Sequence, residues 1–259
     1  MKGSFCLKLL QKYAWPVIGI AAVAFSVWLL YHELRGLSLD ELWDSLMAIP
    51  ARDWLLAVAA TLLAYAALAA YDHLALLHLG KRVGWLYITV ASFTTYALSH
   101  NIGASVFSGS VVRYRAYTAR GLTGAEVGVL VAFCSFTFAL GTVLLTGLAL
   151  IAEPQLAERF VDVLPVEASA ATGAFLLALV ALYVAGSALR LRPLRIGGFE
   201  VHYPQLPIAL RQLVIAPIEL IGAAGIIYFA LPDTGNPGYL VVLGIFLISF
   251  SAALLSHAP

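Results

Sequence analysis

Residues 55–79 read LLAVAATLLAYAALAAYDHLALLHL, and this stretch decides the class of fold. A helix that crosses the ~30 Å hydrocarbon core of a bilayer needs about 20 mostly apolar residues. The run is longer than that, and Asp72 is its single Asp, Glu, Lys or Arg residue. It therefore predicts a transmembrane helix, because so long an apolar segment is rarely found in a water-soluble domain.

The rest of the chain has the same character. Of its 259 residues, 62% are hydrophobic and 11% are charged, whereas soluble domains carry about 25% charged residues. We therefore predict an all-α polytopic membrane protein with five to six full spans plus re-entrant segments. Besides 55–79, the candidate membrane segments are 15–31, 86–106, 126–152, 172–189, 208–231 and 239–255.

Two shorter segments are predicted to lie outside the spans. Ser38 and Glu41 have the spacing of a helix capping box, and the segment 38–49 predicts an amphipathic helix at the membrane interface. Its apolar stripe consists of Leu39, Leu42, Trp43, Leu46 and Ile49. The segment 195–207 contains two prolines and Gly197–Gly198, which predict an extended loop or a short hairpin.

The distribution of lysine and arginine predicts that run 86–106 turns back without crossing. If every run crosses from a cytoplasmic N-terminus, more basic residues lie outside than inside, against the positive-inside rule. If 86–106 is re-entrant, most lie inside, and Arg35, Arg52 and Arg159 lie outside. The middle of that run, SHNIG (99–103), has poor helix formers. The basic residues then placed inside are Lys2, Lys8, Lys12, Lys81, Arg82, Arg113, Arg115, Arg120, Arg190, Arg192 and Arg195.

Two stretches of the sequence resemble each other: FTTYALSH (93–100) and FSAALLSH (250–257). Chance similarity between apolar segments is one explanation. In the re-entrant topology, however, the two copies enter the membrane from opposite sides, as in transporters built from inverted repeats. The chain ends at Pro259, directly after the second copy, so we expect the second half-repeat to be truncated.

Ionisable residues within apolar runs are candidate functional residues. Glu219 lies near the middle of run 208–231, where it belongs either to an ion pair with another span or to a polar cavity for a charged headgroup. Arg211 lies about 12 Å away along the same helix, too far to pair directly. Pro217 removes a helix hydrogen bond between them. Asp72 is either an interfacial charge or a headgroup contact.

The sequence RYRAY (113–117) follows the predicted break and carries Arg113 and Arg115. Topology alone explains such arginines, but guanidinium groups also suit a lipid phosphate. His100 and His257, at the two breaks, are helix-end hydrogen bonders or phosphate contacts. No nucleophile motif, nucleotide-binding loop or metal-ligand spacing is present, so no catalytic role, cofactor or metal is expected.

The stretches SHNIGASVFSGSVVRYRAYTARGLTGAEV (99–127) and FSAALLSHAP (250–259) resemble the membrane domain of the MprF family, the phosphatidylglycerol lysyltransferases or lysylphosphatidylglycerol synthases. A wider group of YbhN-like membrane proteins shares a looser form of the motif. The resemblance implies a bifunctional protein in the bacterial inner membrane. Its C-terminal cytosolic domain would transfer lysine from lysyl-tRNA to phosphatidylglycerol. Its membrane domain would move the product to the outer leaflet and so confer resistance to cationic antimicrobial peptides.

On this resemblance, residues 1–259 are a flippase-like domain without the synthase, and they should not catalyse lysyl transfer alone. Phosphatidylglycerol and lysylphosphatidylglycerol are the expected lipid partners, and a homo-oligomer is compatible with the sequence. The lipid phosphate would meet Arg113, Arg115 or Arg211, and the lysyl amine would meet Glu219 or Asp72. The alternatives are a transporter of another lipid or polyprenyl carrier and a structural anchor for a cytosolic enzyme.

Overall fold

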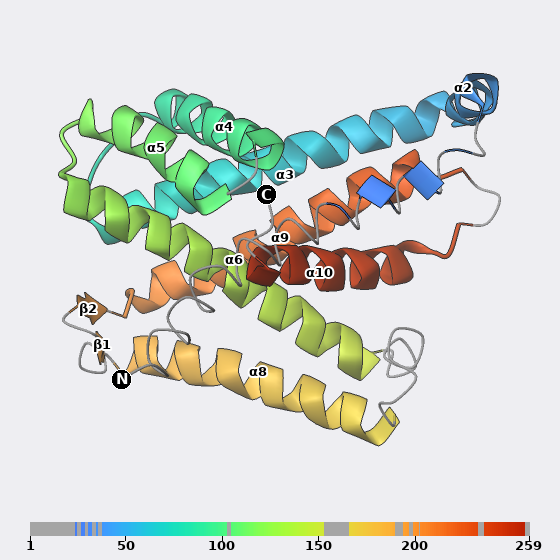
Figure 1. Cartoon of the computed structure of the whole chain (residues 1–259). Helices are drawn as coiled ribbons and strands as arrows, with labels where there is room; N and C mark the ends of the chain where they lie inside the picture. The colour runs from blue at the N-terminus through green and yellow to red at the C-terminus, as the bar shows by residue number, and fades with distance from the viewer. Residues whose placement is uncertain are drawn as a thin grey trace, which may run out of the picture.

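The computed structural model describes residues 24, 27–28, 31–32, 35, 38–102, 105–152, 166–189, 194–196, 199–201, 203–232 and 236–256. These residues fold into packed helices and one small hairpin (Figure 1), which confirms the all-α polytopic prediction. The helices are α2 (Leu39–Met47), α3 (Ala51–His78), α4 (Trp85–Ile102), α5 (Ser105–Thr118), α6 (Gly124–Ala152), α8 (Val166–Ala188), α9 (Leu206–Ala230) and α10 (Tyr239–Ser256). The strands are β1 (Leu194–Ile196) and β2 (Phe199–Val201).

Within the described residues, 4 helices are long and apolar enough to cross a membrane: α3, α6, α8 and α9. Each corresponds to a predicted run. Helix α10 is apolar but offers a shorter stretch, Tyr239–Ser249. Most of the first predicted run, 15–31, lies outside the described residues. These elements agree with a polytopic membrane protein, because an α-helix satisfies its backbone hydrogen bonds within its own segment and so can cross lipid.

The third apolar run turns back, as the charge distribution predicted. Helices α4 and α5 form a hairpin in which the Tyr87 hydroxyl donates to the carbonyl of Ala116 at 2.7 Å. After the hairpin the chain returns to the end of α3, since Lys81 forms a 2.8 Å ion pair with Glu126 at the start of α6. The expected break at 99–103 was placed slightly early, because α4 continues to Ile102. Helix propensity is a weak preference that packing overrides.

Helices α3 and α9 pack closely and run antiparallel, since Ala60 lies opposite Gly225 while Tyr71 lies opposite Ala216. A Cβ added at Gly222 would lie 3.0 Å from the Ala60 carbonyl oxygen. Small residues allow such approach between membrane helices, where packing replaces the hydrophobic effect. Helix α3 supplies a buried alanine at every third or fourth position: Ala57, Ala60, Ala64 and Ala67.

Each of these two long helices is followed by a helix that folds back on it. Tyr65 of α3 packs against Phe93 of α4 with ring centroids 5.0 Å apart, and Tyr228 of α9 packs against Tyr239 of α10 at 5.5 Å. Because α3 and α9 are antiparallel, α4 and α10 start from opposite ends of the molecule (Figure 1). This arrangement agrees with the predicted inverted repeat.

The peripheral segments also follow the sequence predictions. Helix α2 forms where an amphipathic helix was expected, and its Trp43 side chain is 61% exposed, as suits the membrane interface. The predicted loop or hairpin is a two-stranded antiparallel hairpin in which Leu194 pairs with Val201. It leads into α9, which carries Pro207 in its first turn, where the missing N–H costs nothing.

Candidate functional site: a buried polar layer across five helices

The centre of the site is a buried ion pair between Asp72 of α3 and Arg113 of α5. The Arg113 Nη2 lies 2.8 Å and its Nε 3.2 Å from Asp72 Oδ1. The Tyr117 hydroxyl donates to Asp72 Oδ2 at 2.7 Å, and the Cys134 thiol donates to Oδ1 at 3.3 Å. Asp72 is 0% exposed and Arg113 is 6% exposed. One carboxylate thus accepts hydrogen bonds from two neighbouring helices, α5 and α6.

Local helix geometry explains this convergence. Arg113 and Tyr117 are four residues apart on α5, so they lie on one face of that helix. The Arg113 guanidinium also lies over the Tyr96 ring of α4, 4.9 Å from its centroid. Because α4 and α5 are the two arms of the hairpin, both arms hold the same cation. Asp72 therefore fastens the hairpin to α3.

A second carboxylate, Glu219 of α9, contacts Tyr71, the residue before Asp72, and no described cation pairs with it. Its Oε2 is 3.4 Å from the Tyr71 hydroxyl, and Glu219 is 6% exposed. Among the described residues, the ion pairs are Lys81–Glu126 and Asp72–Arg113, and neither involves Glu219. Glu219 lies about 20 Å from the start and about 17 Å from the end of α9, close to the middle of a span.

A third set of polar side chains continues the layer toward α8. The Gln212 amide donates to the Thr137 hydroxyl of α6 at 2.6 Å, and its carbonyl accepts from the Tyr183 hydroxyl of α8. Gln212 and Thr137 are both 0% exposed. Gln212 lies two helical turns before Glu219 on the same face of α9. The polar layer, as we call it, consists of Tyr71, Asp72, Arg113, Tyr117, Cys134, Thr137, Tyr183, Gln212 and Glu219.

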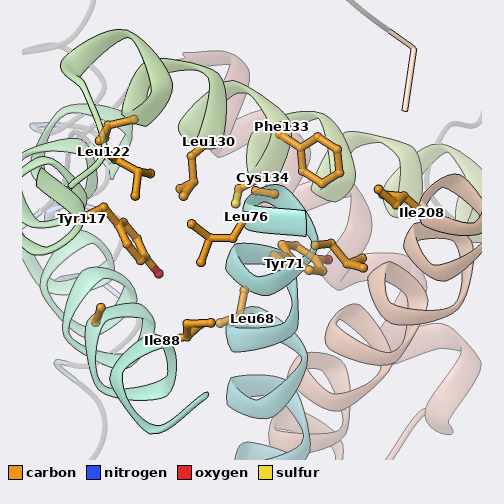
Figure 2. Packing of buried hydrophobic residues seen from close by; sticks show 14 of the residues in the cluster. Leu68, Tyr71, Leu76, Ile88, Tyr117, Leu122, Leu130, Phe133, Cys134 and Ile208 are labelled. Atoms are coloured by element: carbon orange, nitrogen blue, oxygen red, sulfur yellow. The ribbon is translucent and has the colours of Figure 1, made fainter. Parts of the chain in front are cut away.

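Apolar side chains surround much of this layer. Figure 2 shows Tyr71, Tyr117 and Cys134 within one buried cluster, together with Leu68, Leu76, Ile88, Leu122, Leu130, Phe133 and Ile208. Water is therefore excluded around the ion pair, and its charges interact more strongly than at an exposed site. Removing one partner would leave the other charge buried and unpaired.

The structure brings together only some of the predicted site residues. Asp72 is fully buried because the hairpin covers it, while its interpretation as an interfacial charge concerns depth in the membrane and stays a prediction. Asp72 and Arg113 pair with each other, which leaves neither charge open to a headgroup in this conformation. Arg115 and Arg211 are exposed and lie outside the polar layer.

The two candidate histidines lie outside the side chains that the structure describes. His100 belongs to α4, but its side chain is outside the described part of the structure, and His257 lies outside the described residues altogether. Their proposed contact with a lipid phosphate stays a prediction. For Glu219, the described partner is a tyrosine hydroxyl, and no described lysine or arginine forms the ion pair that one of its two interpretations requires. Its interpretation as part of a polar cavity for a headgroup stays a prediction.

Six members of the polar layer were not singled out from the sequence: Tyr71, Tyr117, Cys134, Thr137, Tyr183 and Gln212. Helical spacing would have identified two of them, because Tyr117 follows Arg113 by one turn and Gln212 precedes Glu219 by two. Thr137 gave no signal, since threonine hydroxyls in membrane helices commonly bond to their own backbone. Thr137 does so as well, donating to the Phe133 carbonyl at 2.8 Å. Tyr183 gave no signal because a lone tyrosine in an apolar run does not reveal its partner on another helix.

The layer offers charge and hydrogen bonding rather than a metal site. Among the described residues, no group of three or more His, Cys, Asp or Glu side chains is placed to hold a metal ion. A mid-span carboxylate and several hydroxyls can bind an ammonium group, a proton or both. An apolar groove between α9 and α10, lined by Ile227, Val242 and Phe246 among others, adds no polar group except Ser249.

Two proteins with related sequences were found. The chain is 27% identical over 250 residues to an uncharacterised protein, slr0712, of Synechocystis sp., covering 96% of this chain and 77% of the relative. It is 28% identical over 224 residues to the inner membrane protein YbhN of Escherichia coli K12, covering 85% of this chain and 68% of the relative. No protein-family model matches the chain. The expected similarity to YbhN-like proteins is thus confirmed, while the narrower one to the lysyltransferase family stays a prediction. Together with the four long apolar helices, these similarities identify an integral, multi-pass membrane protein.

Proposed function

We propose that this protein moves a phospholipid with a charged headgroup between the two leaflets of the bacterial inner membrane. The observation that carries the proposal is Glu219, a buried carboxylate near the middle of a span with no lysine or arginine paired to it among the described residues. A charged side chain at this depth costs about 2.5–3.5 kcal/mol on insertion scales and by default indicates function. A headgroup ammonium would supply the missing charge.

The arrangement of the helices supports transport over a purely structural role. Two antiparallel units, α3–α4 and α9–α10, each fold back on themselves, as in transporters with inverted repeats. The hairpin α4–α5 is held to α3 through one buried ion pair. The similarity to an inner membrane protein supports the proposed location. An N-terminus in the cytoplasm is part of the same proposal, because it places most arginines and lysines inside.

For the lipid we propose lysylphosphatidylglycerol, on the strength of the family resemblance and of the charges available. This lipid carries two amines and one phosphate. Glu219 would meet an amine, and the exposed guanidinium groups of Arg115 and Arg211 would meet the phosphate. Asp72 and Arg113 would take part only after their ion pair opens, since each neutralises the other in the structure.

The test is the exposure of the lipid on intact cells. Cells that make lysylphosphatidylglycerol would be treated with a membrane-impermeant amine reagent, with and without this protein, at matched total lipid. We expect less outer-leaflet lipid without the protein and with Glu219→Gln, but normal exposure with Glu126→Gln, a control at the end of a span. Glu126 pairs with Lys81 outside the polar layer.

Each other outcome identifies a different function. Unchanged exposure of lysylphosphatidylglycerol, with altered exposure of another amine-bearing lipid, would make the protein a transporter of that lipid. Unchanged exposure of every lipid would reduce the protein to a membrane anchor. Loss of exposure without the protein but full exposure with Glu219→Gln would keep the transport function and remove Glu219 from the headgroup site.

A further inference from the structure

We infer that Glu219 is also a proton-exchange site, so that lipid movement is coupled to the proton gradient; this inference rests on the proposed function. Glu219 is buried near the middle of α9, and the described residues supply it with no cation. When no headgroup is bound, an ionised carboxylate there has nothing to neutralise it, whereas a protonated one carries no charge to desolvate. A proton and an ammonium would therefore alternate at the same oxygen atoms.

The Tyr71 hydroxyl, the hydrogen-bond partner of Glu219, is placed to accommodate both the ionised and the protonated carboxyl group. The Tyr71 hydroxyl lies 3.4 Å from Glu219 Oε2 and also 3.4 Å from the carbonyl oxygen of Ala216. A hydroxyl has one proton to donate, so it can turn toward the ionised carboxylate or toward the carbonyl when Glu219 is protonated. Pro217 also removes the N–H that would pair with the carbonyl of Leu213, which loosens α9 at this level.

Asp72, the other carboxylic acid of the polar layer, has a cation beside it. Asp72 is balanced by Arg113 at 2.8 Å, so it needs no proton to be neutralised. On the neighbouring helices, Tyr71 of α3 bonds to Glu219, Tyr239 of α10 bonds to the Ile221 carbonyl, and Tyr183 of α8 bonds to Gln212. Asp72, Arg113, Tyr117 and Cys134 form a separate hydrogen-bonded group that begins at the residue after Tyr71. Among these described groups, a carboxylic acid that can lose its proton to make room for an ammonium occurs at Glu219 alone.

The exchange balances in atoms and charge. On the cytoplasmic side, the carboxyl O–H bond of Glu219 breaks, the proton passes to water, and the electron pair stays on the carboxylate, which then binds the ammonium. On the outer side, the ammonium leaves and a proton from water forms the O–H bond again. One proton enters for each headgroup that leaves. Because a lipid with two ammonium groups and one phosphate has a net charge of +1, the exchange moves no net charge, and the pH gradient alone drives it.

The experiment uses the purified protein in vesicles of phosphatidylcholine and phosphatidylglycerol with a minor share of lysylphosphatidylglycerol. In these vesicles the added lipid carries the only lipid amine, so a membrane-impermeant amine reagent measures its exposure, while a trapped dye reports the internal pH. With the outside more acidic, we expect protons to enter and exposure to rise. At equilibrium the outside-to-inside ratio of the lipid should change about tenfold per pH unit. Reversing the gradient should reverse the effect, and a protonophore should abolish it.

The variants separate coupling from movement. In Glu219→Gln, any remaining lipid movement should ignore the gradient and leave the internal pH unchanged, whereas Glu219→Asp and the control Glu126→Gln should stay coupled. Thermal melting in detergent shows whether each variant is folded. Wild-type movement that ignores the gradient, or coupling that survives in folded Glu219→Gln, would overturn the inference and leave the transport function standing. Absence of lipid movement by the folded wild-type protein under every gradient would overturn the proposed function itself.

Discussion

Replacing Asp72 by asparagine removes one charge from the polar layer and keeps the shape of the side chain. In the structure Asp72 is fully buried and accepts hydrogen bonds from Arg113, Tyr117 and Cys134. The substitution leaves the Arg113 guanidinium as an unpaired charge at 6% exposure. Breaking a buried pair in this way costs about 3–5 kcal/mol, and insertion scales give about 2.5–3.5 kcal/mol for an uncompensated charge in a span. We therefore expect Asp72→Asn to lower the free energy of unfolding by about 3 kcal/mol.

A double-mutant cycle distinguishes pairing from a general loss of packing. Arg113→Gln should cost about as much as Asp72→Asn, because it leaves the other charge unpaired. The double variant Asp72→Asn/Arg113→Gln should come back to within about 1–2 kcal/mol of the wild type, since no charge remains buried. The matched control is Glu126→Gln, which breaks the ion pair with Lys81. That pair has the same 2.8 Å separation but its side chains are 34% and 28% exposed, so we expect a loss below about 1 kcal/mol.

The chain provides its own reporter for this measurement. Cys134 is free and buried beside Asp72, and the sequence contains 2 cysteines. In a Cys6→Ser background, a thiol-reactive dye therefore labels Cys134 as the protein unfolds in increasing sodium dodecyl sulfate, and tryptophan fluorescence supplies a second probe. A loss in Asp72→Asn no larger than that in Glu126→Gln, or a double variant equal to the sum of the singles, would refute the buried ion pair.

Three further predictions test the packing around the layer. A Cβ at Gly109 would lie 3.5 Å from that of Ser99, close to the about 3.5–4.5 Å of a disulfide, so Ser99→Cys/Gly109→Cys should cross-link on oxidation; mass spectrometry that finds no cross-link would contradict the α4–α5 hairpin. Gly141→Ala should cost about 1–3 kcal/mol because its Cβ would lie 2.6 Å from a side-chain carbon of α9, whereas Gly128→Ala on the same helix meets nothing within 4 Å and should be neutral or stabilising in detergent melting. Gln212→Leu removes one hydrogen bond from the buried Thr137 hydroxyl and one from the half-buried Tyr183 hydroxyl and should lower the unfolding free energy by about 1–3 kcal/mol; an unchanged stability would show that these hydroxyls find other partners.

The spans and the turning hairpin were predictable because their causes are local. An apolar run of about 20 residues specifies a membrane helix through its own composition, so residues 55–79 identified α3 without reference to the rest of the chain. The return of run 86–106 followed from the side on which arginine and lysine fall. The exact end of α4 did not follow, because packing kept Ser99 to Ile102 helical against a weak local preference.

The sequence by itself also identified Asp72, Arg113 and Glu219 as ionisable residues that need an explanation within apolar surroundings. Only the tertiary structure decided which of them neutralise each other. Asp72 and Arg113 are 41 positions apart, and Tyr71 and Glu219 are 148 apart. Whether such side chains meet depends on the rotation and depth of each helix. Small residues such as Gly141 and Gly222 determine the rotation and depth of their helices, because they allow close contacts with other helices. A hydrophobic pattern tells which residues enter the membrane, but the packed interfaces determine which charge remains without a partner.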